Sequence, residues 1–277
     1  MAAAVKASPL IATDDTIMPM QHPGQTKRAR LWVYVGDGEH PYNIFDFALT
    51  RARDGPANFL GEYKGTLLAD AYGGFDGVVV SNQIRRAGCQ AHARRKFVDA
   101  EASAPALAAE AAAHYRVLYA IERRGRDLDP AARLELRRRE SVPRLEALHA
   151  RLLDWKAELL PKHPMAEAVG YALRQWPALT CFATDGAVPI DNNASEREMK
   201  RVVLHRKNSL FVGNPRGGRT AAILSSFTST CFRHRIDPQR YFTQLLMNLP
   251  GASIEQLDAW LPDRWLARQP PTSPAPN

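Results

Sequence analysis

The sequence predicts an α/β fold, in which a β-sheet is layered with helices. Two observations carry this prediction. Over the first 97 residues, short runs of β-branched and aromatic residues alternate with helix-like segments. From residue 98 a long block rich in Ala, Leu, Glu and Arg has almost no β-branched runs, which is typical of helices. The 277 residues are enough for one large domain or two smaller ones.

The first strands are expected near the start of the chain. Residues 8–16 read as a short strand that ends at the acidic pair Asp14 and Asp15. Residues 21–30 are polar and basic, and we expect a loop there. The runs at 31–36 and 42–49 are separated by turn residues, so they are expected to pair as a hairpin.

A second carboxylate follows another apolar run. We expect a short helix over 55–63, then an apolar run over 65–70 that ends at Asp70, then a loop entering a helix. Asp14 and Asp70 would thus lie at the ends of separate strands. Ligand sites of open α/β sheets are built at strand ends.

The middle of the chain is predicted to be helical. Residues 98–160 read as two or three helices, with breaks at Pro105, at 125–130 and at Pro143. Residues 131–160 have the apolar stripe of one long amphipathic helix, and 165–176 form a further helix. Because this block carries no chemistry of its own, it is interpreted as an inserted helical subdomain.

Acid and base are mixed in residues 186–219. Asp191, Asn192 and Asn193 come first, and Glu196 and Glu198 then lie among Arg197, Lys200, Arg201, Arg206 and Lys207. This composition suits a divalent cation beside a polyanion. It equally suits a capped helix with solvated charges, and the local pattern alone favours that alternative.

Composition restricts the partners and the compartment. The net charge of +8 and the pI near 9.6 favour a polyanionic partner. Three scattered cysteines indicate a reducing compartment without disulfides. Cys89 and His92 have metal-like spacing, but no second Cys/His pair follows at zinc-finger distance, so a buried thiol beside a structural histidine is expected. The sequence shows no membrane span and no convincing signal peptide.

The C-terminal part is predicted to be helical too. We expect helices over 220–232 and 254–261, and between them a helix that Pro238 opens and that runs through 241–249. Trp260 and Trp265 are expected to close onto the body of the protein. The proline-rich end is expected to be disordered.

Four ordered motifs resemble the catalytic region of the DDE transposases of the insertion-sequence 66 family. The resemblance runs from about residue 8 to about residue 266. The first motif comprises 13–16 and 30–35, and the second comprises 68–75 and 88–97. The third comprises 190–197, 206–211 and 217–218, and the fourth comprises 237–241 and 261–265.

The resemblance implies a fold and a domain plan. The fold is an RNase H-like mixed sheet flanked by helices, with an α-helical insertion before the last catalytic helix. The expected parts are 1–97 and 181–222 for the catalytic domain, 98–180 for the insertion, 223–266 for a C-terminal helical segment, and 267–277 for a disordered tail.

The resemblance also implies a site and a reaction. Asp14, Asp70 and Glu196 match the three acids, expected to hold two Mg²⁺ (or Mn²⁺) ions with Asp14 bridging them. These ions would serve DNA cleavage at insertion-sequence ends and strand transfer into target DNA. Asp15, Asp191 and Asn193 are expected to support the ligands or cap the helix. Phosphate contacts are expected from Arg94, Arg95, Lys96, Arg197, Lys200, Arg201, Arg206, Lys207 and Asn208.

The expected partners are DNA, further copies of the chain on DNA and accessory proteins of the same element, in the bacterial cytoplasm at the nucleoid. Only 13 residues precede Asp14, whereas full members have a sizeable N-terminal DNA-end-binding region, so a truncated form or a late start is expected. Two alternatives stay open: an RNase H-like nuclease without strand transfer, and a non-catalytic DNA-binding remnant.

Overall fold

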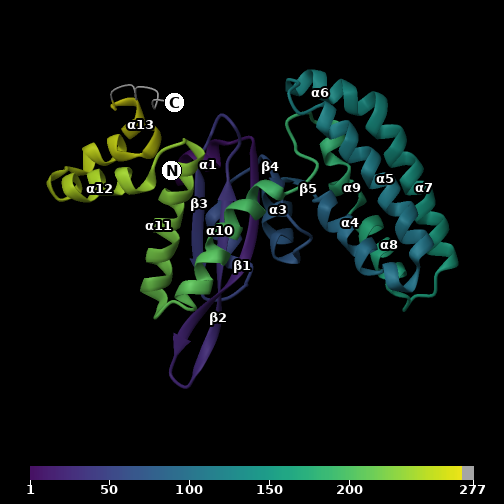
Figure 1. The fold of residues 1–277 in the computed structure, drawn as a ribbon, viewed down its shortest axis with the longest axis horizontal. Helices are drawn as coiled ribbons and strands as arrows, with labels where there is room; N and C mark the ends of the chain where they lie inside the picture. Colours follow the sequence, from purple (N-terminus) through teal and green to yellow (C-terminus); the bar gives the residue numbers. More distant parts are fainter. Residues whose placement is uncertain (270–277) are drawn as a thin grey trace, which may run out of the picture. The chain divides into compact units, whose positions relative to one another are not determined.

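The computed structural model describes residues 1–269 and has a mixed α/β fold with a five-stranded mixed sheet flanked by helices (Figure 1). This confirms the predicted fold class. The chain divides into two compact units. The first unit comprises Met1–Gly61 and the chain from Arg197 onward, and the second unit comprises Glu62–Glu196. Residues 270–277 of the predicted disordered tail lie outside the described residues.

The first unit contains three antiparallel strands, β1 (Leu10–His22), β2 (Gln25–Val35) and β3 (Asn43–Ala48). The β2–β3 hairpin confirms the prediction. The predicted end of the first strand and the loop over 21–30 are wrong, because β1 and β2 form one long ribbon around a tight turn. Gly24 takes a φ of +72° in that turn, a conformation that favours glycine.

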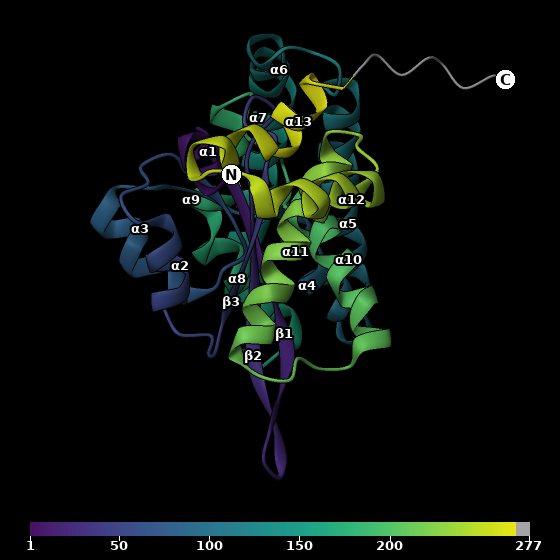
Figure 2. The ribbon, with the colours of Figure 1, turned by 90° about the vertical axis from the view of Figure 1, so that its left-hand side faces the viewer.

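The helices of the first unit are α1 (Ala2–Ala7), α2 (Asp54–Leu60), most of α10 (Asn193–Ser209), α11 (Pro215–Arg233), α12 (Pro238–Asn248) and α13 (Pro262–Ala267). The sheet is covered by α11, and α12 and α13 pack on α11. In Figure 2, α11 runs along the strands. Its hydroxyls bond the edge strand β3: Ser226 Oγ accepts from the Phe45 N–H at 2.8 Å, and Thr230 Oγ1 accepts from the Asn43 N–H at 3.1 Å. The edge strand therefore has partners for its backbone groups.

The C-terminal segment closes as expected. Trp265 is buried with Tyr241 and Cys231, and Trp260 packs against this cluster. Ala267, the first residue of the predicted tail, is the last residue of α13.

The second unit pairs two short parallel strands, β4 (Thr66–Leu68) and β5 (Arg85–Ala87), with a bundle of helices. The helices are α3 (Asp76–Asn82), α4 (Gln90–Asp99), α5 (Pro105–Arg124), α6 (Pro130–Leu136), α7 (Val142–Glu158), α8 (Pro164–Arg174) and α9 (Trp176–Leu179). The bundle core gathers Phe97, Tyr115, Leu148, Leu152 and Trp155, which confirms the apolar stripe read from the sequence.

The predicted break at Pro143 is wrong. A five-residue π-helical turn, Arg137–Ser141, joins α6 to α7, and Pro143 lies in the first turn of α7. The helix continues because the π-helical turn, in which the Val142 N–H donates to the Arg137 carbonyl, changes the hydrogen-bond pattern directly before the proline. No helix within residues 1–269 is long and apolar enough to cross a membrane.

Candidate active site and nucleic-acid interface

Asp14 and Asp15 lie within β1, not at its end, so the predicted position at a strand end is wrong. The two side chains point to opposite faces of the sheet because they are neighbours in a strand. The Asp15 N–H donates to Asp14 Oδ1 at 2.8 Å. Asp15 is 3% exposed and pairs with Arg30 at 2.9 Å and Arg51 at 2.8 Å. Two arginines thus neutralise Asp15.

Asp70 follows β4 by two residues, as the sequence predicts. Its Oδ1 accepts from the Tyr72 N–H at 3.1 Å, and its backbone carbonyl accepts from Arg86 Nη2 at 2.5 Å. Burial lowers the pKa of the Arg86 guanidinium, and the negative charge of Asp70 opposes this shift. A buried cation therefore lies beside the carboxylate that follows β4.

Glu196 lies in the first turn of α10, where the helix dipole favours an anion. Its Oε1 is 3.8 Å from Nδ1 of His92 on α4, and both side chains are about one-third exposed. The Cys89 Sγ, a nitrogen of His92 and an oxygen of Glu196 all lie within 4.8 Å of one another. The expected buried thiol is confirmed, since Cys89 is 1% exposed, and His92 lies near an acid that sequence spacing did not connect with it.

The start of α10 is fixed by the beginning of α4. The Asn192 N–H donates to Cys89 Sγ at 3.3 Å, and the Gln90 N–H donates to the Ile190 carbonyl at 3.1 Å. Burial raises the pKa of the Cys89 thiol, while backbone N–H donors oppose the shift. Residues 89–92 therefore hold the backbone immediately before Glu196.

Asp191 and Asn193 also hold the backbone at the start of α10 in place. Asp191 Oδ1 accepts from the Asn193 N–H at 3.2 Å, and Oδ2 accepts from the Asn193 amide at 2.8 Å. Tyr119 Oη donates to Asp191 Oδ2 at 3.0 Å. Burial, with the nearby Asp191 charge, raises the pKa of Tyr119, so the phenol keeps the proton it donates.

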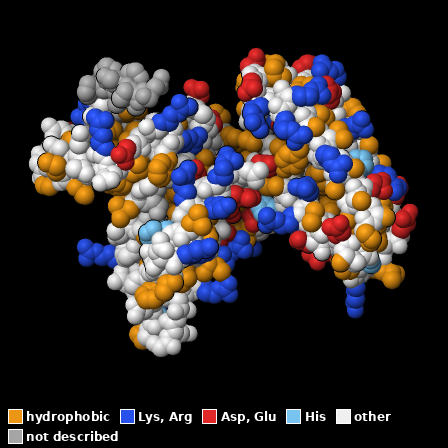
Figure 3. All heavy atoms as spheres, viewed as in Figure 1, with side chains coloured by type: hydrophobic (Ala, Val, Ile, Leu, Met, Phe, Trp, Pro, Cys, Tyr) orange, Lys and Arg blue, Asp and Glu red, His pale blue; other side chains and the backbone are white. Residues whose placement is uncertain are grey.

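The basic cluster Arg94, Arg95 and Lys96 lies within α4 and not at its start. The helix begins at Gln90, so Arg94 and Arg95 lie mid-helix, and Lys96 lies in the last turn, where a cation is favourable. Arg94 and Arg95 are exposed, whereas Lys96 pairs with Glu167 at 3.2 Å. Figure 3 shows Lys and Arg interspersed with Asp and Glu over the helices of the second unit.

The cations of α10 divide into two groups. Arg197, Lys200 and Lys207 are exposed, as is Asn208. Arg201 pairs with Glu198 at 3.3 Å and stacks on Phe232 at 4.5 Å, and Arg206 donates to Thr16 Oγ1 at 3.2 Å and to the Ile17 carbonyl. Two of the predicted phosphate-binding arginines thus already have partners within the first unit.

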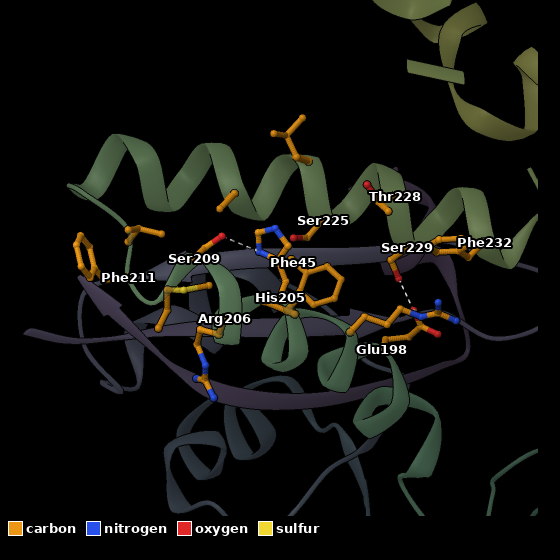
Figure 4. A pocket seen from close by; sticks show the side chains of 16 residues that line it. Phe45, Glu198, His205, Arg206, Ser209, Phe211, Ser225, Thr228, Ser229 and Phe232 are labelled. Atoms are coloured by element: carbon orange, nitrogen blue, oxygen red, sulfur yellow. Dashed lines mark hydrogen bonds and ion pairs between the residues drawn. The ribbon is translucent and has the colours of Figure 1, made fainter. Parts of the chain in front are cut away.

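A pocket of about 460 Å³ in the first unit was not predicted (Figure 4). It is lined by β1, β3, α10 and α11, and Phe45 and His205 point into it. Glu198 lines one end, where Ser229 Oγ donates to it at 2.6 Å. Glu198 is therefore not a solvated surface charge, since its side chain is 18% exposed and anchors α10 to α11.

Gly217 and Gly218 belong to a helix. Both residues lie in the first helical turn of α11, where the Asn214 side chain caps the Gly217 N–H at 2.9 Å. A Cβ at Gly218 would lie 2.5 Å from the Phe47 ring, so this glycine serves close packing of α11 on the sheet.

Comparisons with known proteins match these motifs. The sequence fits the family model described as "Transposase IS66 family" over residues 1–220. It is 34% identical over 282 residues to "Uncharacterized protein y4jD" of Sinorhizobium fredii (strain NBRC 101917 / NGR234), covering 96% of this chain and 55% of that protein. It is also 34% identical over 281 residues to "Uncharacterized protein y4qI" of the same strain, covering 92% and 51%. The chain spans about half the length of these relatives.

Proposed function

Since the chain belongs to the IS66 transposase family, we propose that it catalyses Mg²⁺-dependent DNA cleavage at insertion-sequence ends and strand transfer into target DNA. One observation carries the proposal. The family match over residues 1–220 includes Asp14, Asp70 and Glu196 together with the basic residues of α4 and α10.

The three carboxylates suit the metal that this family implies. Mg²⁺ prefers hard oxygen ligands, and Asp14, Asp70 and Glu196 offer only such atoms. Two such ions, Mg²⁺ or Mn²⁺, supply activation of the attacking water or 3′-hydroxyl and stabilisation of the leaving oxygen. In the proposal the three carboxylates are the ligands of these ions, and Asp15, Asp191 and Asn193 hold the backbone beside them.

The backbone around each acid supports this role. The Asp15 and Tyr72 N–H groups orient the carboxylates of Asp14 and Asp70. Glu196 lies in the first turn of α10, and the backbone before it is held by Cys89 and Gln90.

The exposed cations are proposed to contact the DNA backbone. Arg94, Arg95, Arg197, Lys200 and Lys207 would contact phosphates directly, with Asn208 as a polar contact. Lys96, Arg201 and Arg206 would first exchange their internal partners for phosphate. Copies of the chain and accessory proteins of the same element are proposed partners on DNA.

The test is a cleavage and joining assay on duplex DNA taken from the regions flanking the gene. Asp14→Asn, Asp70→Asn and Glu196→Gln are each expected to abolish Mg²⁺-dependent cleavage, because an amide cannot replace an anionic ligand. Glu198→Gln is the matched control on the same helix, and it is expected to keep cleavage because its partner is Ser229.

Three results would redirect the proposal. Wild-type cleavage by any of the three acid variants would remove that residue from the site. Cleavage without joining of pre-cleaved ends would favour an RNase H-like nuclease. DNA binding without either reaction would favour a non-catalytic remnant.

A further inference from the structure

Cys89 sits where backbone donors converge on its sulfur. It is the residue directly before α4, and the N–H groups of Ala91, His92 and Asn192 point to its side chain. Two of these donors belong to the start of α4 and the third to the start of α10. These N–H groups favour negative charge on sulfur, the form in which cysteine binds metals, but burial raises the pKa of the thiol overall, so a bound cation has to displace the proton.

His92 presents a nitrogen to the same space. Its Nδ1 atom is buried and has no hydrogen-bond partner among the described residues. The Glu196 Oε1 at 3.8 Å is beyond hydrogen-bond range. A buried polar atom without a partner costs free energy, and a bound cation would remove that cost.

These three side chains form a recognisable donor set. Sulfur, imidazole nitrogen and carboxylate oxygen are the ligands of Zn²⁺, and three protein ligands leave a fourth position for water or another ligand. Ligands on a tetrahedral zinc ion lie roughly 3.3–3.8 Å apart, given the usual bond lengths. The present separations, up to 4.8 Å, need to shorten by about 1 Å. His92 and Glu196 are partly exposed and can rotate by that amount.

We propose that Cys89, His92 and Glu196 form a binding site for a zinc-like divalent cation. Binding breaks the S–H bond of Cys89, forms a sulfur–metal bond and releases one proton to solvent. The sequence concealed this site because the third ligand is a glutamate 104 residues beyond His92, not a second Cys/His pair. The proposal concerns metal binding without DNA and does not rest on the proposed reaction. If both hold, zinc and Mg²⁺ compete for Glu196.

The test uses Co²⁺ as a spectroscopic substitute for zinc on the full-length, untagged, metal-free protein. One Co²⁺ per chain is expected, with a near-ultraviolet sulfur-to-cobalt charge-transfer band that reports a thiolate ligand. Zn²⁺ is expected to displace it, and Mg²⁺ in excess is expected to leave the band in place because Mg²⁺ avoids sulfur and imidazole ligands.

Variants assign the ligands. Cys89→Ser is expected to abolish the band, and His92→Ala is expected to weaken Co²⁺ binding at least tenfold. Cys231→Ser is the matched control, since Cys231 is also a buried free thiol but lies in the first unit. It is expected to keep the wild-type band and affinity.

The proposal is overturned if the wild-type protein shows no charge-transfer band, if the band persists in Cys89→Ser, or if Cys231→Ser removes it. Circular dichroism melting checks that each variant is folded. Should Cys89→Ser not fold, the partly exposed His92 decides the matter. Unchanged Co²⁺ affinity in folded His92→Ala then refutes the site.

Discussion

Arg137 holds the segment that leads into α10. Its side chain is 1% exposed and lies on the π-helical turn between α6 and α7. Its guanidinium donates to the two oxygens of Glu122 at 2.8 and 2.6 Å. It also donates to the carbonyls of Phe182, Asp185 and Val188 at 2.8, 2.9 and 3.0 Å. One cation therefore ties α5 to residues 182–188, which precede the helix carrying Glu196.

Replacing Arg137 with Met keeps much of the volume and removes every one of these donors. Glu122, whose side chain is 14% exposed, is left as a largely buried anion, and three carbonyls lose a donor. Breaking a buried ion pair from one side costs about 3–5 kcal/mol. Arg138→Met is the control, because Arg138 is 62% exposed and only 3.9 Å from an equally exposed Glu135. Its expected cost is about 0–0.5 kcal/mol.

Hydrogen exchange measured on peptides of α5 and α7 reports the stability of the second unit by itself. A loss of about 3–5 kcal/mol makes exchange through opening roughly 10²- to 4 × 10³-fold faster in Arg137→Met. Adding Glu122→Gln to Arg137→Met should recover part of the loss, because it removes the isolated buried charge.

An acceleration below tenfold in Arg137→Met, or an equal one in Arg138→Met, would refute the reasoning. Either result would mean that water or the π-helical turn itself satisfies Glu122 once the arginine is gone.

Three further predictions concern DNA binding, close packing and the pH dependence of stability. Arg94→Gln with Arg95→Gln should weaken DNA binding and reduce the salt slope by about 1.8, whereas exposed Arg138→Gln with Arg139→Gln should leave the slope unchanged. Gly218→Ala should cost about 1–3 kcal/mol in urea unfolding because its Cβ meets Phe47, while Gly213→Ala, with open space around it, should cost under about 0.5 kcal/mol. Burial raises the pKa of Cys231 to about 12, so the folded form keeps a proton that the unfolded thiol loses from about pH 9. Stability should therefore fall as pH rises above about 9, by up to about 1.4 kcal/mol per pH unit, and Cys231→Ala should flatten that slope in unfolding measured between about pH 8 and 10.5.

The sequence could predict the elements whose pattern is local. The β2–β3 hairpin, the apolar stripe of α7 and the proline-opened α12 each follow from residues close together in the chain. The length of β1 could not be predicted in this way. Residues 14–17 include polar groups that usually end a strand, but pairing with β2 continues to His22. Arg30, diagonal to Asp15 across the ribbon, satisfies one such group, and that partner depends on the register.

The metal-like spacing of Cys89 and His92 shows the same limit at the site. Two candidate ligands three residues apart are visible in any sequence, but a third ligand is recognisable only if it follows a known spacing. Glu196 follows none, because the whole helical block lies between α4 and α10. Local reasoning therefore identified the thiol as buried and left the partner of the histidine undetermined.

The two glutamates of α10 show what helical geometry adds to a motif. Two residues along a helix correspond to a rotation of about 200° about its axis, so the side chains of Glu196 and Glu198 lie on nearly opposite faces and are unable to serve one site. Glu196 faces His92 of α4, and Glu198 accepts a hydrogen bond from Ser229 of α11. The choice of Glu196 as the metal ligand thus carries a structural corollary. Glu198 is occupied in tying α10 to α11 within the first unit, whereas Glu196 lies beside His92 within the second unit.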